Sequence, residues 1–180
     1  MEKPVKLTED NVGILPEGKE NVRRVFNVIK EKGLHAEIFV HPKTAVTKLQ
    51  ILHDLYGETA DRALKCLCLV SKGRPLVVMA SGEVKIDMVK LSKASHLKEI
   101  RMAGPTELRD LFDRLPGAVD PVTIAQKVQI IFADKRLFEK SWVIGSAGSP
   151  YAGLKIAPSE ITKCVNVQVA DLAELPKELK

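Results

Sequence analysis

The 180-residue chain lacks the residue patterns that mark zinc-binding, thiol-dependent and membrane-spanning proteins. Its three cysteines and four histidines show none of the C-x-x-C, H-x-x-x-H or H-E-x-x-H spacings of zinc and redox sites. Three cysteines cannot all pair, so we expect reduced thiols packed in the core. No apolar run approaches the roughly 20 residues of a membrane span, and none follows the first charges as in a secretory leader. The sequence therefore predicts a soluble, cytoplasmic protein without a metal.

The sequence also lacks the glycine-rich motifs that bind nucleotide phosphates. Neither G-x-x-x-x-G-K-[ST] nor a strand-G-x-G-x-x-G-helix pattern is present, which disfavours ATP and NAD, and we expect no cofactor. What the chain has instead is a basic balance, because 28 Lys and Arg against 23 Asp and Glu give a net charge of +5. These cations are spread along the chain. They fit an anionic partner such as nucleic acid as well as a merely solvated basic surface, and composition alone does not choose between them.

Hydrophobic residues make up 45% of the chain, which at this length predicts one well-buried core and one compact domain. Their spacing changes between the helical and the strand period, which predicts an α+β domain around a mixed sheet. Residues 1–20 mix charges with Pro and Gly and are expected to form an extended or loosely packed arm. The predicted elements are helices over 21–33, 44–57, 87–91 and 106–115, a short helix from 158, a charged turn over 134–140, and strands over 36–40, 63–70, 76–80, 100–102, 128–133, 141–144, 154–156 and 165–169.

The run Ala63–Val70 is apolar except for one cation, Lys65. With the period of two that a strand has, the run is apolar on both faces, which is typical of a strand inside a covered sheet. A lysine is rarely fully buried without a partner or a task. Lys65 therefore either marks the strand end, with its stem on apolar surface and its ammonium in water, or projects into an internal pocket.

Two stretches of small residues, Gly117–Pro121 and Gly145–Gly148, are predicted to be loops. Each can bring backbone N–H groups close to a ligand, because Gly and Ala leave room for approach and glycine adopts positive φ. Taken alone, each such stretch is more often just a turn.

Taken in order, four segments resemble the YbaK/ProX-type aminoacyl-tRNA deacylases, a family similar to the editing domain of bacterial-type prolyl-tRNA synthetases. These segments are the apolar strand with Lys65, the G-x-x-x-P loop at 117–121, the V-x-x-x-F-x-D strand end at 128–134 and the G-S-A-G stretch at 145–148. The resemblance covers roughly Val22 to Val169. It implies a single α+β domain with a mixed, barrel-like sheet core flanked by helices, in which residues 1–20 are an N-terminal arm and residues 21–180 the editing domain.

The resemblance implies a trans-acting hydrolase that cleaves the ester joining a wrong amino acid to the 3′ end of a tRNA. Lys65 takes the place of the family's functional lysine, which we expect to hold a phosphate and to position the 2′-hydroxyl rather than to act as a general base. The loop at 117–121 is expected to stabilise the oxyanion, while a water is activated with help from the 2′-hydroxyl. The substrate-binding residues that the resemblance implies are Gly117, Ala118, Val119, Asp120, Pro121, Gly145, Ser146, Ala147 and Gly148.

The partner implied is the acceptor end of a mischarged tRNA, with an aminoacyl-tRNA synthetase as a further partner and neither DNA nor a membrane. The amino acid removed stays open among alanine, cysteine, serine and threonine. A non-catalytic module that docks on a tRNA acceptor end or on a synthetase has the same fold and is the alternative prediction.

Overall fold

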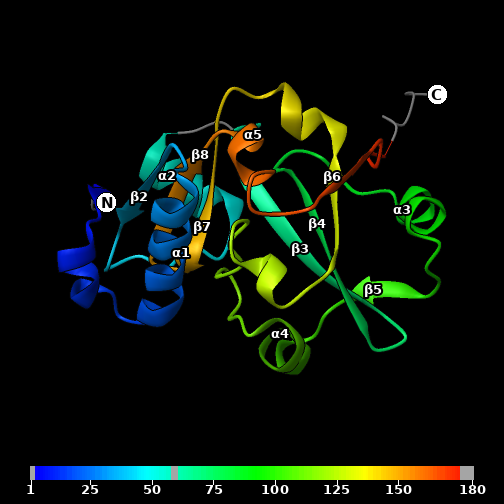
Figure 1. Ribbon diagram of the computed structural model, residues 1–180, viewed down its shortest axis with the longest axis horizontal. Coiled ribbons are helices and arrows are strands. Elements are labelled where there is room, and N and C mark those ends of the chain that lie inside the picture. The colour runs from blue at the N-terminus through cyan, green and yellow to red at the C-terminus, as the bar shows by residue number, and fades with distance from the viewer. Residues whose placement is uncertain (1–2, 58–60, 175–180) are drawn as a thin grey trace.

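The computed structural model of the protein describes residues 3–57 and 61–174. Its strands form two sheets that lie side by side with helices around both (Figure 1). The first sheet is antiparallel throughout, and in it β8 lies between β2 and β7, so that the N-terminal and C-terminal parts of the chain are joined. In spatial order its strands are β1 (Val5–Lys6), β2 (Ala36–Val40), β8 (Ala152–Ile156) and β7 (Val143–Ser149).

The second sheet is mixed, since β3 and β4 form an antiparallel hairpin while β6 runs parallel to both β4 and β9. In spatial order its strands are β5 (Ile100–Met102), β3 (Leu64–Ser71), β4 (Arg74–Ser81), β6 (Ile130–Asp134) and β9 (Gln168–Ala170). β3 is the strand that carries Lys65. Cys68 and Val70 face one hydrophobic cluster and Leu69 faces another, so the prediction of a strand covered on both faces is confirmed.

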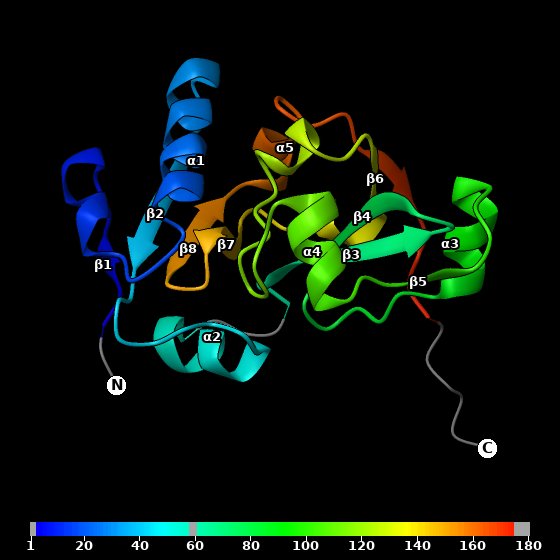
Figure 2. The same ribbon diagram turned by 90° about the horizontal axis from the view of Figure 1, so that it is seen from below.

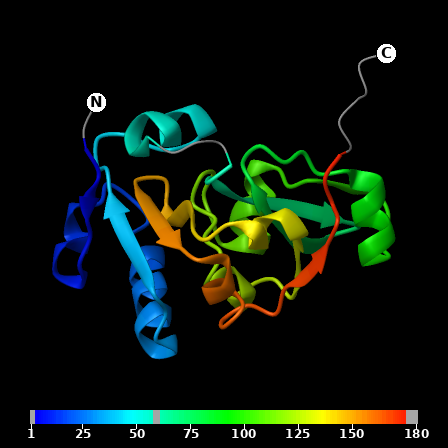
Figure 3. The same cartoon turned by 90° about the horizontal axis from the view of Figure 1, so that it is seen from above.

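Helices cover the outer faces and the ends of the sheets. The α-helices are α1 (Lys19–Lys32), α2 (Leu49–Tyr56), α3 (Met88–Ser95), α4 (Pro105–Phe112) and α5 (Pro158–Ile161), and three 3₁₀-helices are η1 (Glu9–Ile14), η2 (Ile124–Gln126) and η3 (Lys135–Glu139). α1 buries Val22 and Val25 and ends at Gly33, whose φ of +60° glycine adopts without strain. α2 lies on the opposite side of the first sheet from α1 (Figure 2), and α3 lies at the end of the molecule farthest from β1 (Figure 3).

The strands do not close into a barrel, which corrects the barrel-like core that the resemblance implied. Among the described residues they form two separate sheets, linked by an isolated parallel bridge between Ala63 and Ile144. At this junction the Ile144 N–H donates to the Arg62 carbonyl at 2.9 Å. The coarser prediction of a mixed α+β domain is confirmed, and the split between the sheets leaves room for a cavity.

The first residues are not loosely packed, as their charges and prolines had suggested. β1 pairs with β2, and Leu7, Val12 and Leu15 are each at most 3% exposed. Because three apolar residues among the charges are spaced to reach the core, hydrophobic burial fixes the segment. The division at residue 20 stays a prediction.

Three local predictions are corrected by contacts from distant parts of the chain. α2 begins at Leu49 and not near Thr44, because Val46 N–H is taken by the Pro150 carbonyl at 2.7 Å. Residues 134–140 are not an open turn, since Asp134 accepts from Arg136 N–H at 3.1 Å and caps η3. Residues 145–148 are part of β7. None of the helices in the described ranges has the length and apolar character needed to cross a bilayer.

Candidate active site

A cavity of about 330 Å³ lies where β3 of the second sheet approaches β7 and β8 of the first, with α2 and the residues before it as a further wall. Of the predicted site residues, five line it and five do not. Those that line it are Lys65, Gly117, Val119, Gly145 and Ser146. The other lining residues are His41, Val46, Thr47, Lys48, Leu49, Leu52, Tyr56, Ala63, Leu64, Cys66, Gly82, Ser149, Pro150, Ala152 and Gly153.

Lys65 projects from the start of β3 into this cavity, so the second of the two interpretations of the sequence applies. Its Nζ donates to the Gly82 carbonyl at 3.1 Å and to the Val84 carbonyl. Burial lowers the pKa of Lys65, because desolvation disfavours the charged form. Two of its three N–H donors are used by these carbonyls, so one is left for a ligand.

Gly117 opens the loop after α4 and brings it against the residues before α2. Its φ is +77°, and a Cβ there would lie 2.6 Å from the Val46 carbonyl oxygen, so only glycine fits. The Ala118 N–H donates to the Leu115 carbonyl at 3.0 Å. In the described part of the chain no acceptor takes the N–H of Gly117 or of Val119, and both residues line the cavity.

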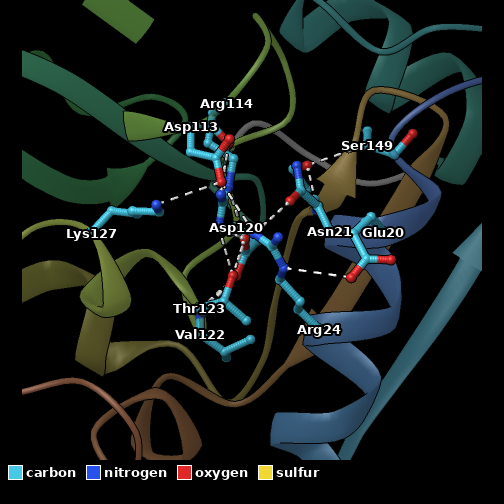
Figure 4. A network of polar contacts seen from close by, with 12 residues as sticks. Glu20, Asn21, Arg24, Asp113, Arg114, Asp120, Val122, Thr123, Lys127 and Ser149 are labelled. Carbon is cyan, nitrogen blue, oxygen red and sulfur yellow. Dashed lines mark hydrogen bonds and ion pairs between the residues drawn. The ribbon is translucent and has the colours of Figure 1, made fainter. Parts of the chain in front are cut away.

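Asp120, expected to bind substrate, does not line the cavity, and its carboxylate lies in a buried polar network (Figure 4). Its Oδ2 accepts hydrogen bonds from Arg114 Nη2 at 3.0 Å and from the Thr123 hydroxyl at 2.6 Å. Its Oδ1 accepts hydrogen bonds from the backbone N–H groups of Val122 and Thr123. Arg114 is 3% exposed, and Asp120 and Thr123 are fully buried. The network holds the loop that carries Gly117 and Val119. Ala118 and Pro121 are buried in the same loop and do not line the cavity.

The residues of Gly145–Gly148 belong to β7, so they are divided between the two faces of the first sheet. Gly145 and Ser146 line the cavity, and a Cβ on Gly145 would lie 3.1 Å from the Leu64 carbonyl oxygen. Ala147 is fully buried on the α1 side, and a Cβ on Gly148 would lie 3.0 Å from the Asn21 side chain. The small residues are therefore needed for close packing between strands and helix as well as for access to the cavity.

His41 and α2 supply lining residues that were not among the predicted site residues, although the resemblance implied pocket residues near His41 and Thr44. His41 is 1% exposed, with its Nδ1 2.6 Å from the Thr44 carbonyl oxygen, and its ring meets that of Tyr56 edge to face. The Tyr56 hydroxyl is buried with no well-aligned partner among the described residues, and burial raises the pKa of the phenol more than the nearby Gly153 backbone lowers it. A Cβ on Gly153 would lie 2.5 Å from that hydroxyl. The apolar stripe of α2 indicated only a core helix.

The thiols are poor candidates for catalysis. Burial raises the pKa of Cys66, the thiol that lines the cavity, well above its ordinary value. Burial also raises the pKa of Cys68 to about 12 and that of Cys164 to about 11. All three stay protonated near neutral pH and are weak nucleophiles. Within residues 3–57 and 61–174, no group of three or more His, Cys, Asp or Glu residues is arranged to hold a metal ion.

Residues 43–164 match the family model described as the aminoacyl-tRNA editing domain. The chain belongs to this family. The matched range contains every residue that lines the cavity except His41. The cavity is therefore built almost wholly from the part of the chain that the family shares.

Two solved structures share the fold of this editing domain. One is the crystal structure of a candidate trans-editing enzyme for prolyl-tRNA synthetase, with a TM-score of 0.73, 24% identity, and coverage of 86% of this chain and 98% of that chain. The other is a hypothetical protein with a TM-score of 0.76, 22% identity, and coverage of 84% and 99%. At these identities the likeness shows the fold.

Curated relatives are of two kinds. The proline–tRNA ligase of Thiobacillus denitrificans is 30% identical over 96 residues, which are 53% of this chain and 17% of the ligase. EbsC of Enterococcus faecalis, named as a candidate Cys-tRNA(Pro)/Cys-tRNA(Cys) deacylase, is 28% identical over 117 residues, which are 64% of this chain and 71% of EbsC. The editing domain thus matches a small part of the ligase and most of the length of EbsC.

Proposed function

We propose that this editing domain hydrolyses, in trans, the ester that joins a wrongly attached amino acid to the 3′ end of a tRNA. The observation that carries the proposal is the half-buried Lys65 ammonium in a cavity that Gly117 and Val119 of the 117–121 loop also line. Family membership and the likeness to EbsC and to the candidate trans-editing enzyme support it. A tRNA substrate would be met in the cytoplasm, where we place the activity.

In this proposal Lys65 positions the substrate and does not abstract a proton. Its carbonyl partners stabilise the ammonium form, and its remaining N–H can bind an oxygen of the terminal phosphate. An ammonium fixed at one point places the ribose, and with it the 2′-hydroxyl, beside the ester. The attacking water is then activated with help from that hydroxyl.

The negative charge that develops on the ester carbonyl oxygen requires preorganised donors. The N–H groups of Gly117 and Val119 are available, and the Arg114–Asp120 network holds the loop in place. Backbone donors of this kind typically contribute about 10²–10³-fold in rate. The size of the cavity fits a small amino acid, and alanine, cysteine, serine and threonine are the candidates.

The test is a panel of tRNAs charged with these four amino acids and with proline, incubated with the purified protein at neutral pH. We expect release of at least one small amino acid well above the spontaneous rate, and slower release of the others. If no charged tRNA is hydrolysed faster than in buffer, the hydrolase is excluded. Co-elution with tRNA or with a synthetase, without hydrolysis, would then support the non-catalytic module.

A further inference from the structure

A second, open groove lies on the first sheet and contains the single tryptophan of the chain, Trp142. Two cations lie over the indole ring: the Lys155 Nζ is 4.1 Å from the ring centroid, and the Arg62 guanidinium carbon is 5.1 Å from it. Arg62 is also held by the Ser141 hydroxyl at 3.1 Å and by the Trp142 carbonyl at 3.4 Å. The two cations are therefore fixed in place by an aromatic ring and neutral groups.

Three cations lie at or beside the groove, Lys155 in its lining, Arg62 over Trp142 and Lys6 on Glu37, against one lining carboxylate. In the described residues neither Lys155 nor Arg62 forms a salt bridge with a carboxylate. The one carboxylate that lines the groove, Glu37, is bound by Lys6 at 2.7 Å, and this contact, with a weaker effect from Lys155, lowers the pKa of Glu37. Cations without carboxylate partners attract anions, and phosphates are the anions that a tRNA brings.

The groove and the cavity are neighbours on the same face of the first sheet. Gly153, which lines the cavity, and Lys155, which lines the groove, are two residues apart on β8, so both point to the same face about 7 Å apart. Tyr56 lines the cavity at this point, with its hydroxyl close to Gly153 and its ring in edge-to-face contact with Phe39 of β2. Trp142 packs against the same small cluster as Tyr56.

We propose that this groove binds the single-stranded nucleotides that precede the 3′ terminus of the tRNA, with Lys155 and Arg62 on their phosphates and Trp142 against a base. The inference rests on the proposed function, because it places the terminal nucleotide in the cavity. The preceding nucleotides must then leave along a neighbouring surface. An aromatic ring with adjacent cations is the chemistry that binds single-stranded nucleic acid without reading its sequence.

Because Trp142 is the only tryptophan, its fluorescence reports on this groove alone. The first experiment titrates the wild-type protein with uncharged tRNA at low salt and follows both tryptophan emission and retention of labelled tRNA on a filter. We expect an emission change that saturates with the dissociation constant found by retention. Binding with no change in emission would overturn the proposal.

The second experiment uses the double variant Arg62→Gln/Lys155→Gln, with Lys93→Gln on α3 as the matched control at the far end of the molecule. The double variant should bind uncharged tRNA more weakly, and the slope of log K against log salt should become shallower by roughly 1–2. Lys93→Gln should bind as the wild type does. Trp142→Ala should weaken binding roughly 5–150-fold. Melting temperatures identify variants that have lost the fold, and for these Trp142→Phe replaces Trp142→Ala.

Hydrolysis separates this inference from the proposed function. With mischarged tRNA the double variant should show a raised KM with kcat retained, and with an aminoacyl ester of adenosine alone it should match the wild type. If the wild type hydrolyses mischarged tRNA while the double variant keeps wild-type KM, affinity and salt slope, the groove is excluded and the proposed function stands. If the wild type hydrolyses nothing but the groove variants lose tRNA binding, the proposed function fails and the groove is a tRNA site.

Discussion

Lys65 and Arg114 are two cations that the fold withdraws from water in opposite ways. Arg114 is 3% exposed and meets a carboxylate, a hydroxyl and the Asp113 carbonyl at 2.7–3.0 Å. Lys65 is half-buried and meets two carbonyls, and no carboxylate among the described residues pairs with it. A buried charge that is fully bonded holds the structure, whereas one that keeps a donor free at a cavity is prepared for a ligand.

One loop connects the surroundings of the two cations. The Arg114–Asp120 network fixes the loop whose Gly117 and Val119 line the same cavity as Lys65. Near this network, Arg24 of α1 binds Asp113 at 3.1 Å, which ties the first sheet's helix to the end of α4 (Figure 4). Rigidity in the network should therefore be needed for activity at the cavity.

The largest effect is expected where the fully bonded pair is broken. Asp120→Asn leaves the buried Arg114 guanidinium without a counter-charge and should lower the free energy of unfolding by about 3–5 kcal/mol. Chemical denaturation measures this. The matched control is Asp113→Asn, an exposed carboxylate seven residues earlier that pairs with Arg24, and it should cost less than about 1 kcal/mol. Equal losses in the two variants would show that the buried pair does not hold the loop.

The next effect is on rate and not on stability. Lys65→Met removes the cavity cation but keeps the apolar stem, so deacylation should fall by about 10²-fold or more while the melting temperature stays within a few degrees. Lys93→Met is the control. Because burial lowers the pKa of Lys65, a role that needs the ammonium also fails as pH rises through a value below that of an ordinary lysine. Near wild-type rates in Lys65→Met would remove this residue from the mechanism.

A smaller effect tests whether the loop needs its close approach to the residues before α2. In Gly117→Ala the alanine must adopt a strained φ of +77°, and its Cβ clashes with the Val46 carbonyl oxygen. The variant should therefore lower the free energy of unfolding by about 1–3 kcal/mol and also reduce the rate of deacylation. Gly73→Ala is a matched control, since its φ is +79° and no atom lies within 4 Å of the added Cβ. Backbone strain alone should lower the free energy of unfolding of Gly73→Ala by about 1–2 kcal/mol, and the deacylation rate per folded molecule should not change. If both variants lose activity equally, the Val46 contact plays no part.

The smallest effect on stability is expected for the thiols, which are buried like the two cations but carry no charge. Cys68→Ala removes a small buried group and should cost roughly 1 kcal/mol, with turnover per folded molecule unchanged. Since the pKa of Cys68 is raised to about 12, iodoacetamide at neutral pH should also leave hydrolysis intact. Inactivation of the folded protein by the reagent would direct the search for the catalytic group to the thiols.

Sequence reasoning succeeded where local pattern and burial agree. The apolar run around Lys65 was predicted to be a strand covered on both faces, and it is one. Residues 117–121 were predicted to form a loop, and Gly117 and Val119 of this loop line the cavity. It was wrong for residues 145–148, which belong to β7. Small residues there are required by the Leu64 backbone and by Asn21 of α1, which are distant in the sequence.

The sequence by itself determined the α+β class and the family, because the order of a few short motifs and the spacing of apolar residues are properties of the chain alone. It also determined that Lys65 interrupts an apolar strand. Tertiary structure alone decided that Asp120 turns into the protein while Val119 turns to the cavity, and that Tyr56 and Lys155 lie on the same sheet face. The reason is physical: the direction of a side chain in a loop or on a helix is set by the partners that satisfy its charge and bury its apolar surface, and here those partners come from other parts of the chain.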